Sequence, residues 1–215
     1  MLLTLRSTQI ELLPDKALYL PSEQTLILSD VHLGKAQTFQ KSGIPVPEGD
    51  DALDLSRIST LLSSRETRHL IIAGDLFHSR EGTTPELIDL LQRWLESHDV
   101  QVTLVIGNHD EDVLSRCRHL PMETIERMTI GELEVVHDPA HAHASPFSIC
   151  GHIHPVVVLT EGRGTAHRLP CYHLTDSMLT LPSFGSFTGG KVAKTEPGHR
   201  LFVMHQERVI EVPVT

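Results

Sequence analysis

The chain has few basic residues for its length. Its 215 residues include 18 Lys and Arg against 28 Asp and Glu, which gives a formal net charge of −10. A protein that holds nucleic acid through a broad basic surface has the opposite balance. The charge therefore argues against binding of that kind. It does not exclude a nucleic-acid substrate, because bound divalent cations would offset the negative charge locally.

Cysteines and long hydrophobic runs are also scarce. The three cysteines, Cys117, Cys150 and Cys171, are odd in number and far apart, and no C-x-x-C pair is present. This pattern argues against a disulfide framework or a zinc knuckle and predicts reduced thiols in the core. No apolar run is long enough to cross a bilayer, and residues 1–6 lack the basic start and apolar core of a secretory signal. We therefore predict a cytoplasmic protein.

The chain shows no internal repeat, low-complexity tract or flexible linker, so we predict a single domain over residues 1–215. Three apolar runs, at 25–28, 69–73 and 100–106, predict buried strands that each open into a polar loop. Amphipathic helices are expected at 50–62 and from Pro85 to Leu95. This alternation predicts an α/β fold with ligands at the carboxyl ends of the strands.

The other predicted strands are short. An N-terminal hairpin is expected around Pro14-Asp15, and after about residue 120 the pattern changes to short strands, which predicts a second sheet packed against the first. The runs concerned are 9–13, 17–20, 122–126, 132–136, 148–150, 156–159, 178–181, 201–205 and 209–212.

Histidine is abundant, with 15 residues. Five of them belong to polar segments that follow predicted strands, and most of the other ten are typical of surface histidines. The segments are Asp30-Val31-His32, Gly74-Asp75, Gly107-Asn108-His109-Asp110, His137 and Gly151-His152-Ile153-His154. Their imidazole, carboxylate and amide groups suit manganese, iron or zinc better than calcium. The predicted ligands of a two-metal site are Asp30, His32, Asp75, Asn108, His137, His152 and His154.

Each of these residues alone is also compatible with an ordinary turn. The prediction depends on their ordered coincidence, because unrelated turns need not end in these residue types. His141 and His143 compete with His137 for the ligand role. We favour His137 because it ends an apolar run, where a ligand would be held rigidly.

The motifs resemble those of the calcineurin-like metallophosphoesterase superfamily. Its pattern of D-x-H, G-D-x-x-D, G-N-H-D/E, H and G-H-x-H is matched between residues 26 and 155, except that His78 replaces the second Asp of G-D-x-x-D. The resemblance implies a four-layer α/β/β/α sandwich of two mixed sheets, with a dinuclear metal site at the strand ends. It further implies one ion held by Asp30, His32, Asp75 and His154, and a second held by Asp75, Asn108, His137 and His152.

The same resemblance implies hydrolysis of phosphoesters. Two cations about 3.5–4 Å apart, bridged by Asp75 and a hydroxide, would supply a nucleophile that attacks phosphorus in line with the departing oxygen. His109 is left free by the ligands, so it is the predicted catalytic group at the leaving oxygen, with a purely supporting hydrogen bond as the alternative. His78 cannot supply the fixed charge of the usual Asp, so it would support His109 differently. Lys35 is predicted to meet a substrate phosphate, unless it is a solvated loop lysine.

A narrower resemblance is carried by residues 29–35, 39–49, 74–79 and 181–190. These segments are similar to the bacterial ligase-associated DNA damage response endonucleases, the PdeM family. That resemblance implies a manganese-dependent DNA endonuclease associated with a DNA ligase, a helicase and an exonuclease. A small-molecule phosphodiesterase or phosphatase is the alternative. A non-catalytic scaffold is disfavoured because every ligand position is filled.

Overall fold

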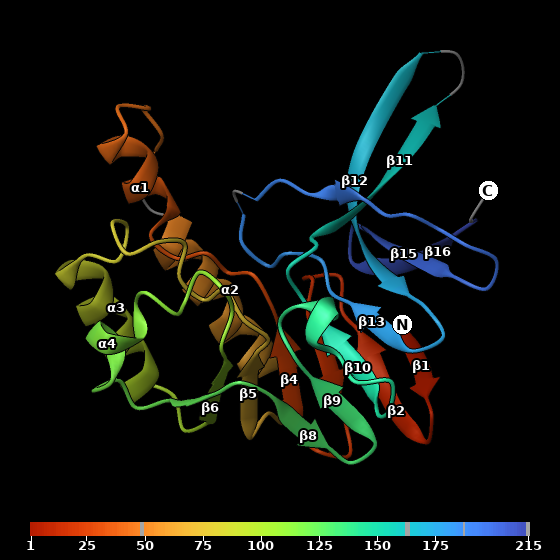
Figure 1. Cartoon of the computed structure of the whole chain (residues 1–215), viewed down its shortest axis with the longest axis horizontal. Helices are drawn as coiled ribbons and strands as arrows, with labels where there is room; N and C mark the ends of the chain where they lie inside the picture. Colours follow the sequence, from red (N-terminus) through yellow and green to blue (C-terminus); the bar gives the residue numbers. More distant parts are fainter. Residues whose placement is uncertain (48–49, 162–163, 187, 214–215) are drawn as a thin grey trace.

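The computed structural model describes residues 1–47, 50–161, 164–186 and 188–213, with the side chain of residue 161 left out. Residues 48, 49 and 187, which belong to the PdeM-like segments, therefore lie outside the described residues. The described ranges form two β-sheets that share one core. Figure 1 shows the four α-helices gathered on the side of β5 and β6, and the β11–β12 ribbon projecting from the opposite part of the molecule.

The first sheet has seven strands in sequence order, β1 to β7. Its first four strands pair antiparallel and its last four pair parallel. The strands are β1 (Leu2–Leu5), β2 (Thr8–Leu12), β3 (Leu18–Leu20), β4 (Thr25–Leu28), β5 (His69–Ile72), β6 (Gln101–Val105) and β7 (Glu123–Ile125). Helices α1 (Lys35–Lys41), α2 (Asp50–Ser64), α3 (Pro85–Glu96) and α4 (Leu114–Cys117) lie in the connections between the parallel strands. The predicted hairpin, strands and two helices are confirmed here. The run at 122–126 adds to this sheet beside β6, and not to the second sheet.

The second sheet follows the order β14-β11-β12-β13-β10-β9-β8, and β15 pairs with both β12 and β16. Its strands are β8 (Met128–Ile130), β9 (Leu133–Val135), β10 (Phe147–Cys150), β11 (Pro155–Glu161), β12 (Thr165–Leu174), β13 (Met178–Thr180), β14 (Lys191–Val192), β15 (Arg200–His205) and β16 (Arg208–Val212). Parallel and antiparallel pairs occur in it, so both sheets are mixed, which confirms the predicted α/β class with two mixed sheets. In the described part of this half the only helix is the 3-10 turn η1 (Pro139–His141).

Alternating side chains explain why the central strands have continuous apolar sequences. In β4, Leu26 and Leu28 pack against the helices, whereas Ile27 faces the second sheet. In β5, Leu70 and Ile72 face the helices and Ile71 faces the second sheet. A strand covered on both faces has no solvent side, so every residue after the first one of each strand (Thr25 and His69) is apolar.

No helix in the described ranges has both the length and the apolar character that crossing a membrane requires.

Tyr172 connects the second sheet to the turn between β2 and β3 of the first sheet. It lies on β12 and is fully buried, and its hydroxyl is 2.6 Å from the carbonyl oxygen of Leu13 and 2.8 Å from that of Ala17. These carbonyls belong to the turn between β2 and β3. Without the hydroxyl, both carbonyls would lose a hydrogen-bond donor inside the core. The hydroxyl therefore stabilises the packing of this hairpin on the second sheet.

We predict that Tyr172→Phe lowers the free energy of unfolding by about 1–2 kcal/mol, because it removes the buried donor and keeps the ring. Urea unfolding followed by circular dichroism measures the change. Tyr19→Phe is the matched control: its hydroxyl donates to the backbone of the exposed Glu66, so its loss should cost less than about 0.5 kcal/mol. Equal losses in the two variants would contradict the account.

Candidate metal centre

The polar segments predicted from the sequence meet at one place, where strands of both sheets end. Asp30 and Asp75 follow β4 and β5 of the first sheet, while His137 and His152 follow β9 and β10 of the second. Two groups of side chains there bring their ligand atoms within 4.8 Å of one another. The first group is Asp30, His32 and His154, and the second is Asp75, His137 and His152. Each group takes residues from both sheets.

The first group is centred on His154. Its Nε2 lies 2.9 Å from Oδ1 of Asp30 and 3.4 Å from Nε2 of His32. Nδ1 of the same ring is 3.2 Å from the carbonyl oxygen of Gly189, an acceptor that keeps the proton on Nδ1 and leaves the Nε2 lone pair turned inward. Burial lowers the pKa of His32 to about 3, so this imidazole is neutral, as a metal ligand must be.

The second group is centred on His137. Its Nε2 lies 3.2 Å from Oδ2 of Asp75, 3.2 Å from Oδ1 of Asn108 and 3.3 Å from Nδ1 of His152. Nδ1 of His137 is 3.0 Å from the carbonyl oxygen of Ala73, which fixes the ring as Gly189 fixes His154. Burial lowers the pKa of His137, but the hydrogen bond and the charge of Asp75 outweigh it and raise the pKa to about 9.

Both groups fit a divalent metal ion. Each aims imidazole nitrogens and carboxylate oxygens at a common point, and such lone pairs repel one another unless a cation or a proton lies between them. The pKa of His137 is raised for the same reason: the negative charge around this ring stabilises a positive charge at its Nε2. The mixture of nitrogen and oxygen donors is that of manganese, iron and zinc sites.

The backbone at these residues adopts a conformation that side chains rarely tolerate. φ is positive, in the left-handed region, at five of them: Asp30 (56°), His32 (56°), Asp75 (51°), His152 (66°) and His154 (48°). For residues other than glycine this region costs on the order of 1–3 kcal/mol each. Strain of this size persists where the surrounding structure enforces it, and it is typical of functional sites.

Asp110, for which the sequence predicts no role, holds the loops that follow β5 and β6. Its side chain is fully buried and accepts hydrogen bonds from the backbone N–H groups of Asp75, Phe77 and Gly107, at 2.9, 3.0 and 2.9 Å. Burial raises its pKa to about 7, although the donors of Phe77 and Gly107 oppose the shift. The residue is present in the segment Gly107 to Asp110, but only the folded structure brings its three donors together.

Two glycines are required because ligand side chains occupy the space beside them. A Cβ on Gly74 would lie 2.1 Å from Nδ1 of His137, and its φ of 87° also disfavours other residues. A Cβ on Gly107 would lie 2.2 Å from Oδ1 of Asp75. Any side chain at either position would displace a group of the metal centre.

His109 lies at the open side of the centre. Its backbone N–H donates to Oδ1 of Asp75 at 3.0 Å, and its ring Nε2 is 4.0 Å from Oδ2 of the same residue. The side chain is 40% exposed, so a substrate can reach it. The ring stacks on His78 at 5.5 Å between centroids, and His78 stacks on Phe39 at 6.1 Å. Burial lowers the pKa of His78 to about 4, so this residue meets His109 as a neutral ring.

The remaining predicted residues fall around the centre. Lys35 is the first residue of α1 and not part of a loop. Burial lowers its pKa, and its charge in turn lowers the pKa of the buried His32 and the half-buried His78. His143 lies outside both groups and contacts Glu134. His141 lines a hollow beside the second group together with Asn108 and His152.

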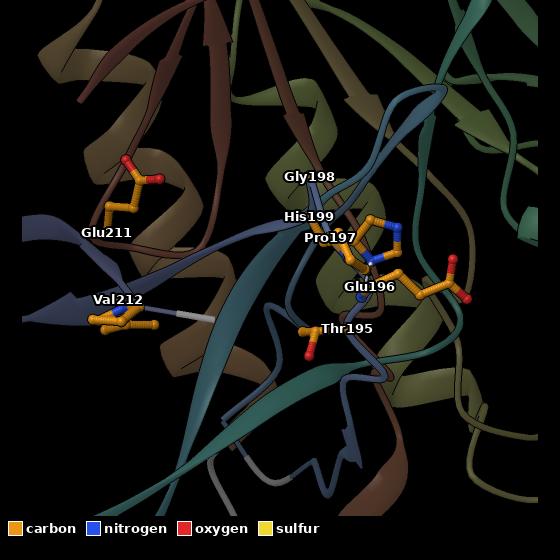
Figure 2. Close-up of a pocket in the computed structure, with 8 residues that line it drawn as sticks. Thr195, Glu196, Pro197, Gly198, His199, Glu211 and Val212 are labelled. Carbon is orange, nitrogen blue, oxygen red and sulfur yellow. Dashed lines mark hydrogen bonds between the residues drawn. The ribbon is translucent and has the colours of Figure 1, made fainter. Parts of the chain in front are cut away.

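A separate cavity of about 810 Å³ lies away from the metal centre (Figure 2). The described residues that line it come from the loop 195–199 and from the end of β16, and they include His199 and Glu211. None of them belongs to the two metal-binding groups. The chemistry of the site is therefore not connected to this cavity.

Comparison with known proteins agrees with the geometry. The profile of the calcineurin-like phosphoesterase family matches residues 24–173. A solved structure described as Pseudomonas putida nuclease MPE is similar to this chain, with 31% identity and a TM-score of 0.84 over 99% of each chain. A protein of unknown function from Aquifex aeolicus, with 18% identity and a TM-score of 0.42 over 60% of this chain and 78% of its own, is too distant to carry an argument. A search of curated proteins found no match.

The family profile covers well over half of the chain, and the similar structure covers nearly all of it. Two groups of Asp and His side chains that could hold a metal ion lie at the ends of the strands. The chain therefore belongs to the calcineurin-like phosphoesterase family and is a hydrolase of the metallophosphoesterase type.

Proposed function

We propose that this protein is a manganese-dependent phosphodiesterase that cuts DNA internally. The observation that carries the proposal is its likeness, over 99% of both chains, to a structure described as a nuclease. The PdeM-like segments support it, and they also favour a role in the DNA damage response beside a ligase, a helicase and an exonuclease. This association and the cytoplasmic location remain predictions from the sequence.

For the metals, we propose that Asp30, His32, Asp75 and His154 hold one ion, and that Asp75, Asn108, His137 and His152 hold the other. The distances around His154 and His137 support this division. Asp75 is the shared ligand, since its charge acts on both His32 and His137. When bound, two such ions neutralise phosphoryl oxygens and make water a nucleophile at neutral pH.

His109 is the proposed catalytic residue. The hydrogen bond from its backbone N–H to Asp75 fixes the position of the residue, and the exposure of its side chain leaves the ring open to a substrate. From this position the imidazole donates a proton to the departing oxygen. His78 is its positioning residue, because the two rings stack and the low pKa of His78 keeps it uncharged. Lys35 contributes positive charge for a substrate phosphate.

Purified protein with Mn²⁺ is expected to nick plasmid DNA or cleave single-stranded DNA, as followed on gels. Asp75→Asn should abolish the activity, because it removes the charge shared by both ion positions. Asp89→Asn, at an exposed position of α3, is the control and should retain it. Turnover of a cyclic dinucleotide or a nucleoside 2′,3′-cyclic phosphate without DNA cleavage would overturn the DNA proposal in favour of a small-molecule phosphodiesterase.

We expect His109→Gln to lower kcat by about 10²–10⁴-fold, the usual contribution of a positioned general acid. Because His109 is not a proposed ligand, Mn²⁺ binding measured by calorimetry should stay unchanged. His119→Gln changes an exposed histidine and serves as the control. A variant that loses metal along with activity would instead assign His109 to the metal shell.

Divalent metal is expected to stabilise the fold. Saturation of one site at about 100 times its dissociation constant adds about 2.7 kcal/mol, which raises the Tm of a domain of this size by about 5–10 °C. Thermal scans with Mn²⁺, Fe²⁺ and Zn²⁺ after chelator treatment measure this shift. His154→Ala should reduce it and His119→Ala should not. The absence of a shift with all three ions would argue against a resident metal.

A further inference from the structure

Two segments run side by side away from the metal centre. They begin at ligand residues, where the N–H of His32 donates to the carbonyl of Asp75 at 3.0 Å and the N–H of Leu33 donates to that of Leu76 at 2.8 Å. A parallel bridge between Leu33 and Phe77 continues the pairing. The first segment becomes α1, and the second becomes the loop 78–84. The outer ends of both segments are therefore fixed relative to the metal centre.

Close contacts hold α1 on this loop. A Cβ on Gly82 would lie 2.1 Å from the carbonyl oxygen of Gly34, so the two backbones touch. The hydroxyls of Thr38 and Ser79 are 2.8 Å apart, and Lys41 Nζ donates to the carbonyl of Glu81 at 2.6 Å. Side chains on α1 and on the loop thus form one surface.

At the outer end this surface carries a basic hollow of about 220 Å³. Three exposed cations line it, Lys41, Arg80 and Arg116, together with one carboxylate, Glu81. Arg116 Nη1 donates to the carbonyls of Arg80 and Thr83 at 3.1 and 3.2 Å, which holds its guanidinium at the hollow. Within the described ranges, no carboxylate lies at ion-pair distance from any of the three cations.

Between the metals and this hollow lie Lys35 and the stacked rings of Phe39 and His78. Cationic side chains beside aromatic rings are the combination that binds single-stranded nucleic acid. Lys35 and Lys41 stand at the two ends of α1, about 9 Å apart along its axis, which corresponds to two or three base steps of a stacked strand.

The hollow beside the second metal-binding group has the opposite charge. It is lined by Glu111, Glu126 and Asp138, in addition to His141 and the ligands. A polyanion is repelled there and attracted toward Lys41 and Arg80. The electrostatic potential around the centre therefore favours a strand that runs toward Lys41 and Arg80.

We infer that the hollow formed by Lys41, Arg80 and Arg116 is a subsite for a backbone phosphate of single-stranded DNA, two or three nucleotides from the bond that is cut. The inference rests on the proposed function, and it deepens that function by making the enzyme selective for strands over small diesters. A diester too short to reach the hollow gains nothing from it.

The test compares Lys41→Gln/Arg80→Gln with Arg6→Gln/Arg208→Gln, which removes two exposed cations, one in the turn after β1 and one at the start of β16. Substrates are a single-stranded oligonucleotide of about twelve nucleotides and bis-p-nitrophenyl phosphate. The first variant should lose about tenfold in kcat/KM on the oligonucleotide, about 1.4 kcal/mol, and stay within about twofold on the small diester. Its binding to the oligonucleotide, measured by anisotropy in an Asp75→Asn background, should lose about 0.7 from the slope of log K against log salt, because one phosphate contact is lost. Thermal unfolding confirms that both variants are folded.

Equal losses on both substrates, equal losses in the control, or an unchanged oligonucleotide rate would each overturn the inference. Failure of the proposed function looks different, because the unaltered protein would then hydrolyse the small diester and leave DNA intact. In that case the anisotropy measurement decides: binding that depends on Lys41 and Arg80 supports the subsite, and binding that does not depend on them refutes it.

Discussion

The buried carboxylate of Asp110 is the constraint on which the metal centre depends. A carboxylate without partners is costly inside a protein, and so are backbone N–H groups without acceptors. Asp110 and the N–H groups of Asp75, Phe77 and Gly107 satisfy one another, which closes the loops after β5 and β6 into one unit. That unit turns the carboxylate of Asp75 toward His137 and toward the N–H of His109. It also supports the left-handed backbone at Asp75.

The sequence was most informative where chemistry and secondary structure coincide at one point of the chain. After their first residues, the runs at 25–28 and 69–73 are apolar because both faces of those strands are covered, and the polar residues after them mark the edge where the sheet is expected to bind ligands. Helix α3 was visible from Pro85 and its apolar spacing, and Thr84 caps it as such a start requires.

Other features depend on contacts between distant parts of the chain. Helix α1 starts after Gly34, which offers no side-chain cap, and the N–H of Gly34 itself donates to Asp51 of the next helix at 2.9 Å. Half of β12 is exposed, and the strand contains Pro170, so its sequence lacks the pattern of a strand. The structural role of Asp110 and the stacking of His78 on His109 likewise appear only when loops separated by about thirty residues come together. Such contacts leave no periodic signal along the sequence.

Each metal-binding group is divided between the two sheets, with Asp30, His32 and Asp75 on one side and His137, His152 and His154 on the other. The apolar layer between the sheets thereby sets the distance between the two halves of each group. If one sheet slid over the other by the width of a single side chain, the ligands of both groups would therefore move apart together. Substitutions that repack the layer between the sheets, far from any ligand, are therefore expected to change catalytic activity as well as stability. The two properties are expected to evolve together.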